Sequence, residues 1–249
     1  MASEAAIELR GVRRSFGKHE VLKGIDLVVR HGKTRVILGP SGSGKTVIMK
    51  HMIGLLRPNA GEVLVEGHDI AKLEGDDLLQ IRRKFGMVFQ QAALFDSMTV
   101  GDNVAFPLRE HTKLGKREIA ERVREKLALV DLVGIEHKFP AELSGGMRKR
   151  VGLARAIVLE PSIVLYDEPT TGLDPLTTES VDQKILDANR RLQVTSVVIS
   201  HDVGSALQVA DDIAVINEGV IVEDCPASEI KKSTHPFVRR FLDTWFHKQ

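Results

Sequence analysis

One glycine-rich stretch has the residue types and spacing of a phosphate-binding loop. Residues 39–46 read Gly-Pro-Ser-Gly-Ser-Gly-Lys-Thr, a full G-x-x-x-x-G-K-[ST] pattern between an apolar strand-like run and a helix-like run. Backbone N–H groups and a helix N-terminus attract phosphate, while glycines let the backbone approach it closely. Lys45 would reach the β- and γ-phosphates, and Thr46 would bind Mg²⁺. We therefore expect a nucleoside triphosphate on Gly39, Pro40, Ser41, Gly42, Ser43, Gly44, Lys45 and Thr46.

Two adjacent carboxylates follow a second apolar run, residues 163–166. Asp167 is placed to hold Mg²⁺, directly or through water, as the acidic partner of the phosphate loop. Glu168 would orient the attacking water or accept its proton. The plainer interpretation is a strand that ends in solvated acids. Because the chain also carries a phosphate loop, we favour the catalytic interpretation.

Two further polar residues end strand-like runs. His201 follows residues 197–200, and its imidazole could contact the γ-phosphate and fix the water or Glu168. Gln90 ends the run 85–90 and could bind Mg²⁺ weakly while touching the water. Alone, either residue would be an ordinary strand-end side chain. Because ligands gather beyond the carboxyl ends of strands in an open parallel sheet, we assign both to the catalytic set.

A second glycine turn precedes a basic helix. Residues 143–147 read Leu-Ser-Gly-Gly-Met, and a Ser with two glycines at a helix start makes another anion site. Since one chain needs only one phosphate loop per nucleotide, we expect Ser144, Gly145 and Gly146 to face the ATP of a second subunit in a two-fold dimer. The basic run 148–156 could instead be a solvated helix face, which is what we expect for Lys149 and Arg150 individually.

The hydrophobic pattern predicts one α/β domain over residues 1–249 that positions these groups. Its core, with a small antiparallel sheet, would cover about residues 5–90 and 160–230. A helical block over about residues 91–159 would be an insertion, because Ile119, Val123, Leu127 and Val130 share a helix face. The expected strands are residues 7–12, 22–29, 35–38, 61–67, 85–90, 163–166, 194–200 and 213–216.

Composition excludes several functional classes. The chain has 249 residues, 43% of them hydrophobic and 28% charged, as in ordinary globular proteins. Its net charge of +1 gives no reason to expect nucleic acid as a partner. No apolar run reaches the roughly 18–20 residues that cross a bilayer, and we expect no secretion signal. Cys225 is the single cysteine, which fits a cytosolic location.

The order of these motifs resembles that of the ATP-binding-cassette ATPases, over nearly the whole chain. The resemblance implies a P-loop NTPase (RecA-like) core with an antiparallel β subdomain and an inserted α-helical subdomain, using ATP and Mg²⁺. It implies that Phe16 stacks on adenine and that Asp174, in the loop 171–174, serves communication between two subunits. Three departures are Phe16 for the usual Tyr, Met147 for Gln, and Thr-Gly for Ser-Ala in the communication loop. None removes a phosphate, metal or water ligand.

Met147, the phrase 107–112 and the phrase 92–95 resemble a subgroup, the ATPases of MCE-type (Mla) phospholipid transporters. That resemblance implies a peripheral subunit at the cytoplasmic face of a bacterial inner membrane. Its implied partners are a second copy, an integral membrane permease with a coupling helix in a cleft beside Gln90, an MCE lipid-binding protein and a STAS-like accessory subunit. The alternatives are the ATPase of an importer for a polar solute and a soluble ATPase that acts on nucleic acid or ribosomes. The chain has neither the long coiled-coil insertion nor the second cassette of the latter.

Aromatic residues recur every four positions near the C-terminus, in a tail over about residues 235–249. Phe237, Phe241 and Trp245 form this stripe in a chain with only 4% aromatic residues. The spacing predicts a helix packed on its own domain or on the partner cassette. Docking of an accessory subunit is the alternative.

Overall fold

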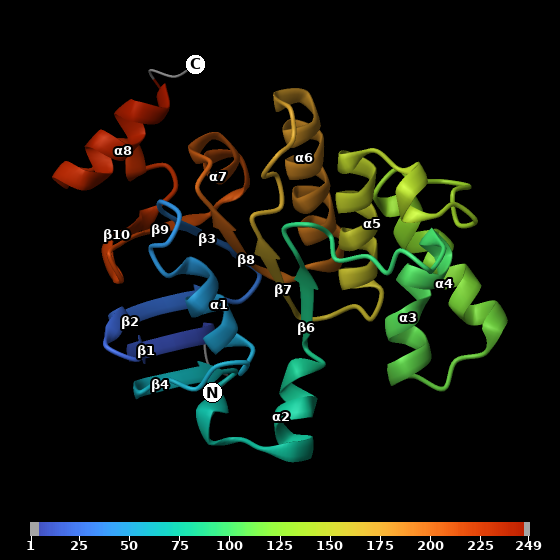
Figure 1. The fold of residues 1–249 in the computed structure, drawn as a ribbon, viewed down its shortest axis with the longest axis horizontal. Helices are drawn as coiled ribbons and strands as arrows, with labels where there is room; N and C mark the ends of the chain where they lie inside the picture. Colours follow the sequence, from blue (N-terminus) through green and yellow to red (C-terminus); the bar gives the residue numbers. More distant parts are fainter. Residues whose placement is uncertain (1–4, 247–249) are drawn as a thin grey trace. The chain divides into compact units, whose positions relative to one another are not determined.

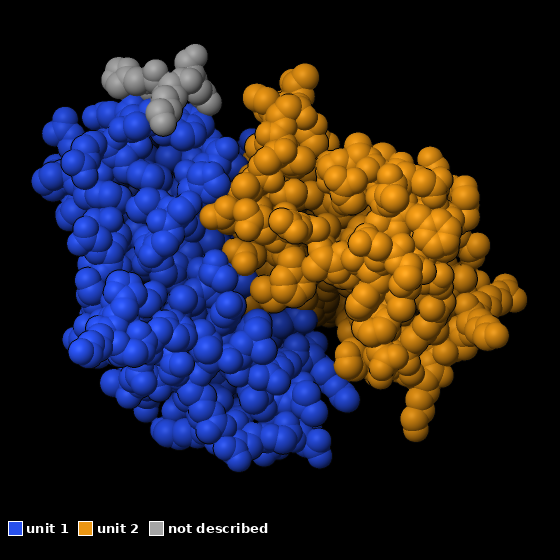
Figure 2. Space-filling view, in the orientation of Figure 1, with its two compact units in different colours: residues 1–85, 195–249 blue, residues 86–194 orange. Residues whose placement is uncertain are grey.

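The computed structural model describes residues 5–246, which form two compact units (Figure 2). Unit 1 combines the chain up to residue 85 with the chain from residue 195 onward, and unit 2 is the segment 86–194. Figure 1 labels the helices and strands. Within residues 5–246, no helix is both long and apolar enough to cross a membrane.

The first sheet of unit 1 is antiparallel, as the sequence predicts. Its strands are β1 (Ala5–Phe16), β2 (His19–Arg30), β4 (Ala60–Val65) and β5 (His68–Asp69), in the order β2-β1-β4-β5. Along β2, buried and exposed residues alternate, because successive side chains of a strand point to opposite faces. Phe16 is the last residue of β1 and pairs with His19 across a tight hairpin.

The second sheet carries the phosphate loop. In unit 1, β3 (Thr34–Leu38) lies between β8 (Thr195–Ser200) and β9 (Asp212–Asn217) and is parallel to both, while β10 (Val220–Pro226) is antiparallel to β9. Every residue of β3 and β8 is buried. Leu38 pairs with Ser200, so the loop that starts at Gly39 and His201 leave the sheet at the same edge. The helices α1 (Lys45–Met52), α2 (Gly75–Arg82) and α7 (Val203–Val209) also belong to unit 1.

Unit 2 is mainly helical. Neighbouring strands β6 (Phe85–Val88) and β7 (Ile163–Asp167) accompany α3 (Val100–His111), α4 (Lys116–Leu129), α5 (Gly145–Ile157) and α6 (Pro175–Leu192). The helices α3, α4 and α5 pack on one another, and α6 packs on α4 and α5. The predicted helix face is confirmed: Ile119, Val123, Leu127 and Val130 are all buried. Three short 3₁₀ turns, η1 (Ile70–Lys72), η2 (Pro140–Glu142) and η3 (Ile230–Lys232), complete the elements of the two units.

The C-terminal aromatic stripe lies on α8 (Pro236–Phe246), which packs on unit 1 and so confirms the predicted helix. Val238 is fully buried and Leu242 is 5% exposed. The indole of Trp245 lies directly on the backbone of Gly204, at the start of α7. A Cβ on Gly204 would lie 2.7 Å from Cζ2 of that indole. The indole of α8 can therefore pack on the start of α7 because Gly204 has no side chain.

This contact gives a stability prediction. We expect Gly204→Ala to lower the free energy of unfolding by about 1–3 kcal/mol, because the added methyl group meets the indole. Trp245→Ala in the same chain removes the obstacle, so the double variant should be less destabilised than the sum of the two single variants. Urea denaturation measures all three, with Asp243→Ala on the exposed side of α8 as the control. Simple additivity would show that the two residues do not touch.

Candidate functional site

The phosphate loop has the glycines that its backbone path requires. Gly42 and Gly44 adopt φ angles of 80° and 109°, in the left-handed region that favours glycine. A Cβ on Gly44 would also lie 2.9 Å from Cδ2 of Leu22, and a Cβ on Gly39 would collide with the carbonyl oxygen of Ile216. The loop between β3 and α1 thus depends on glycine backbone at these positions, as a phosphate-binding nest requires.

The polar groups of the loop suit an anionic ligand. Lys45 is 4% exposed, and its Nζ donates hydrogen bonds to the carbonyl oxygens of Gly39 at 2.8 Å and Pro40 at 2.9 Å. The hydroxyl of Ser43 is buried and has no hydrogen-bond partner in the structure. An unpaired buried hydroxyl is costly, so this group fits a donor to a bound phosphate oxygen. Thr46, the second residue of α1, is exposed.

The predicted base-stacking residue has a fixed, accessible ring. Phe16 is 46% exposed at the end of β1. The guanidinium carbon of Arg14 lies 4.8 Å from its ring centroid, a cation–π contact. Arg14 is itself held, because its Nη1 donates to the carbonyl oxygen of Arg57 at 2.9 Å. The ring therefore offers a flat apolar surface in the same unit as the phosphate loop.

His201 is exposed and lies just beyond β8. The hydroxyl of Ser200 accepts a hydrogen bond from the Asp202 N–H at 2.9 Å, and the Asp202 carboxylate caps α7 by accepting from the Ser205 N–H at 3.1 Å. Together with aromatic residues of α8, His201 lines a hollow of about 330 Å³. The sequence did not indicate this neighbourhood of α8 and His201, since only the folded chain brings them together.

In unit 2, the structure brings Gln90 and Glu168 together. Asp167 ends β7, and Glu168 follows it with a φ of 47°. The Glu168 Oε2 accepts hydrogen bonds from Thr171 Oγ1 at 2.9 Å and from Gln90 Nε2 at 3.4 Å. A carboxylate held by two donors in a turn has a defined direction, as a group that positions a water requires. The sequence placed Thr171 in the loop 171–174 but did not predict its contact with Glu168.

The Ser-Gly-Gly turn and Asp174 form two helix N-termini in contact. The Ser144 hydroxyl caps α5 by accepting from the Met147 N–H at 3.3 Å. Asp174 caps α6, accepting from the Thr177 N–H at 3.0 Å and the Thr177 hydroxyl at 2.5 Å, and the latter bond lowers the pKa of Asp174. A Cβ on Gly146 would lie 2.5 Å from Cγ2 of Thr177. Glycine at this position is therefore required for the two helices to meet.

The expectation that Lys149 and Arg150 form a solvated helix face is wrong. Lys149 is 8% exposed, and its Nζ donates to the carbonyl oxygen of Thr171 at 2.9 Å. Arg150 is half-buried, and its Nη1 donates to the carbonyl oxygen of Val130 at 3.1 Å. Both long side chains donate to backbone carbonyls of other segments, and the sequence pattern of α5 alone could not predict these contacts.

The expected Mg²⁺ ligands are oxygen donors of three kinds: the Thr46 hydroxyl, the Gln90 amide and the Asp167 carboxylate. Among residues 5–246, no three His, Cys, Asp or Glu side chains gather as a metal site. Mg²⁺ is commonly held by one or two carboxylates together with substrate phosphates and water. The Thr46 hydroxyl of unit 1, and the Gln90 amide and Asp167 carboxylate of unit 2, are each donors of a type that suits Mg²⁺.

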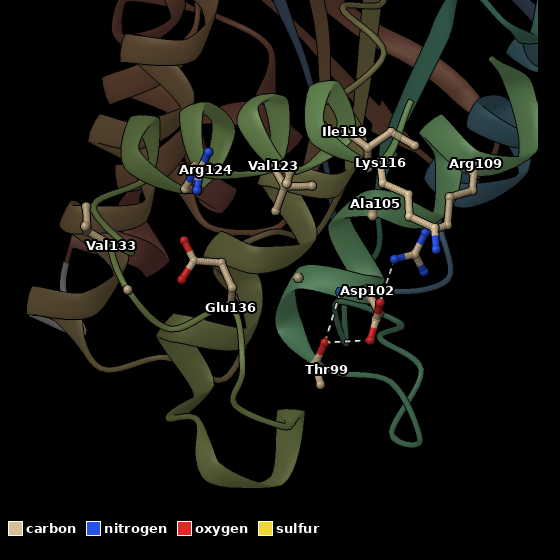
Figure 3. A pocket seen from close by; sticks show the side chains of 13 residues that line it. Thr99, Asp102, Ala105, Arg109, Lys116, Ile119, Val123, Arg124, Val133 and Glu136 are labelled. Carbon is tan, nitrogen blue, oxygen red and sulfur yellow. Dashed lines mark hydrogen bonds and ion pairs between the residues drawn. The ribbon is translucent and has the colours of Figure 1, made fainter. Parts of the chain in front are cut away.

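Two of the hollows in unit 2 bear on function. The larger, of about 950 Å³, is a groove between α3 and α4 (Figure 3). Ala105, Ile119 and Val123 give it an apolar floor. Its rim is charged, and Arg109 Nη2 donates to Asp102 Oδ1 at 2.7 Å. The second hollow, of about 540 Å³, is lined by Gln90 and residues of the 171–173 loop.

The family model described as "ABC transporter" matches residues 22–171, which is more than half of the chain. This chain belongs to the ABC transporter family. The match begins in β2 and runs through the phosphate loop, the Ser-Gly-Gly turn and the Asp167–Glu168 pair. The chain is an ABC ATPase, and its nucleotide and metal are ATP and Mg²⁺.

Curated relatives of this ABC ATPase carry different transport names. The chain is 46% identical to the "probable ribonucleotide transport ATP-binding protein mkl" of Mycobacterium leprae, covering 98% of this chain and 70% of that protein. It is 40% identical to the "intermembrane phospholipid transport system ATP-binding protein MlaF" of Escherichia coli, covering 95% of this chain and 88% of that protein. The resemblance to Mla-type ATPases drawn from the sequence is thus confirmed, while the relatives' names cover several cargo classes, among them ribonucleotides, phospholipids and Fe(3+) ions.

Solved structures agree on the fold. The ATP-binding cassette MJ0796, described as a dimeric post-hydrolysis state bound to ADP and Pi, matches with a TM-score of 0.80 and 32% identity. The match covers 89% of this chain and 98% of MJ0796. It confirms the predicted P-loop NTPase architecture, in which the four-stranded antiparallel sheet and the helical block accompany the nucleotide-binding core.

Proposed function

We propose that this ABC ATPase powers phospholipid trafficking between bacterial membranes, through an integral membrane permease of the Mla type. The observation that carries the cargo assignment is the correspondence with E. coli MlaF, which spans 88% of that protein. Met147, in place of the Gln usual in ABC signatures, agrees with this subgroup. The chain would then work as a peripheral subunit at the cytoplasmic face of the inner membrane. An MCE lipid-binding protein and a STAS-like subunit complete the proposed partners.

The residues take the following proposed roles in hydrolysis. The phosphate loop binds the β- and γ-phosphates, and Phe16 stacks on adenine. Glu168, held by Thr171 and Gln90, orients the attacking water and takes its proton at Oε2. His201 contacts the γ-phosphate from the edge of the sheet. Thr46, Asp167 and Gln90 would hold Mg²⁺, which would supply positive charge against the phosphates.

We propose that two copies of the chain bind ATP between them. Ser144, Gly145 and Gly146 of one copy would contact the γ-phosphate bound by the other, and Asp174 would lie at the subunit contact. The proposal is supported by the cap that Ser144 forms at the start of α5, because a helix N-terminus attracts anions. It is also supported by the structure of MJ0796, which is a dimer in its post-hydrolysis state. ATP would favour the closed dimer, and hydrolysis would release it.

The hollow beside Gln90 remains the proposed place for the coupling helix of the permease, and we propose the α3–α4 groove as a second docking site for the same partner. The apolar floor and charged rim of the α3–α4 groove suit a short amphipathic helix that lays its apolar face into a groove. Val133 lies at its edge and is 77% exposed, which is unusual for a large apolar side chain. A partner that covers Val133 would explain why an apolar residue stands at this exposed position.

We expect Val133→Asp to weaken association with the permease by about tenfold or more, since a carboxylate would be desolvated at the contact. The ATPase activity of the isolated chain should stay unchanged. Affinity is measured with the detergent-solubilised permease, and Leu79→Asp is the matched control, an exposed apolar residue on α2. Unchanged permease affinity in Val133→Asp would move the docking site elsewhere.

The cargo is tested on the intact complex purified from native membranes. Mass spectrometry of its extract should identify phospholipid, and ATP should drive phospholipid transfer between reconstituted and acceptor vesicles. Ribonucleotide in place of lipid, with no lipid transfer, would favour the polar-solute importer that the name of the mycobacterial relative suggests. Recovery of the chain with ribosomes or nucleic acid, and with no membrane protein, would favour a soluble ATPase.

A further inference from the structure

Lys149 joins the helix that starts at the Ser-Gly-Gly turn to the segment that carries Glu168. Its Nζ donates hydrogen bonds to the carbonyl oxygen of Thr171 at 2.9 Å and to that of Glu168 at 3.5 Å. The lysine comes from the middle of α5, whereas both carbonyls belong to the turn that follows β7. All three residues lie within unit 2. One ammonium group therefore holds both ends of the turn 168–171.

This turn has an uncommon backbone. Glu168 has a φ of 47°, although it is neither glycine nor asparagine and stands directly before Pro169. A residue before proline prefers an extended conformation, so the surrounding contacts must hold Glu168 in the left-handed region. Within the turn, the Thr171 N–H donates to the Glu168 carbonyl oxygen at 3.3 Å, and the Thr171 hydroxyl donates to the Glu168 carboxylate. Gln90 donates to the Glu168 carboxylate from outside the turn, and Lys149 adds contacts from α5 to the two backbone carbonyls.

The environment of Lys149 shows that these bonds matter to the fold. The side chain is 8% exposed, and burial lowers the pKa of its ammonium group, while the negative charge of Glu168 acts in the opposite direction. A buried ammonium group is costly unless hydrogen-bond acceptors replace its water. The carbonyls of Glu168 and Thr171 supply that replacement. An aliphatic residue would fill the same space but would donate to neither carbonyl oxygen.

We propose that Lys149 is a positioning residue for Glu168: it fixes the turn from which the carboxylate is aimed at the attacking water. The proposal rests on the proposed catalytic role of Glu168. Lys149 acts through the two carbonyl oxygens and needs no contact with nucleotide. Its removal should therefore slow the chemical step and leave ATP binding nearly intact.

The test compares Lys149→Met, Lys149→Gln and Arg150→Met in the full chain. We expect Lys149→Met to lower kcat by about 10-fold or more, the effect of losing a charge-assisted hydrogen bond, with KM for ATP changed by less than about 2-fold. Lys149→Gln keeps a donor and should restore part of the rate. Arg150→Met is the matched control. It removes a cation from the same helix, but this cation donates to the carbonyl oxygen of Val130 and not to the turn. Thermal unfolding of each variant reports on folding.

A fourth comparison separates this inference from the role of Glu168. If Lys149 acts through Glu168, the double variant Lys149→Met/Glu168→Gln should hydrolyse ATP no more slowly than Glu168→Gln alone. A wild-type kcat in Lys149→Met beside a slow Glu168→Gln would overturn the inference and leave the proposed function standing. A double variant that hydrolyses ATP more slowly than Glu168→Gln alone would also overturn the inference. A wild-type rate in Glu168→Gln itself would overturn the proposed role of Glu168.

Discussion

Glu168→Gln should slow ATP hydrolysis by about 10²-fold or more and leave ATP binding intact. The amide has the shape of the carboxylate but cannot accept the proton of the attacking water. The hydrogen bond from the Thr171 hydroxyl can be kept by the amide oxygen, so the turn need not change. Single-turnover hydrolysis of radiolabelled ATP measures the chemical step, and equilibrium binding of a fluorescent ATP analogue measures affinity.

The control for this variant is Glu179→Gln, the same change on α6 and outside the catalytic set. It should hydrolyse ATP at the wild-type rate. If Glu168→Gln also kept that rate, the water would be activated by another group. Loss of binding together with hydrolysis would instead assign Glu168 to the nucleotide site and not to the chemical step.

Lys45→Ala should weaken ATP binding by about 10²-fold or more, because the phosphates lose a buried, charge-assisted partner. The carbonyl oxygens of Gly39 and Pro40 already hold the ammonium group in the loop. Little conformational entropy of this side chain is therefore lost when ATP binds. Isothermal titration calorimetry with ATP and Mg²⁺ measures the effect. Lys50→Ala, an exposed lysine of α1, is the control. Equal affinities in the two variants would show that Lys45 does not contact the phosphates.

The phosphate loop could be predicted from the sequence because its chemistry needs contiguous residues. Glycines, lysine and hydroxyl must follow one another along one turn, and the flanking runs show a strand and a helix. The same holds for Asp167 and Glu168 at the end of β7. The antiparallel sheet was also predictable, since its strands alternate buried and exposed residues.

Contacts between distant segments could not be predicted in this way. Lysine is rarely buried, so a single sequence places Lys149 on the surface, whereas its partner Thr171 is supplied by another element. The hollow that His201 shares with α8 could not be predicted either, because its two sides come from separate segments of the chain. The helix α6 was missed because its sequence is polar, although Asp174 before Pro175 is a recognisable helix start.

The dimer is tested most directly by the mass of the trapped, nucleotide-bound protein. Sedimentation of Glu168→Gln with ATP and Mg²⁺ should give a particle of two chains and two nucleotides, and Ser144→Arg in that chain should return it to a monomer. Sedimentation without nucleotide should give monomers in both cases. A strictly monomeric Glu168→Gln at saturating ATP would contradict the account, because Ser144 would then face no bound γ-phosphate.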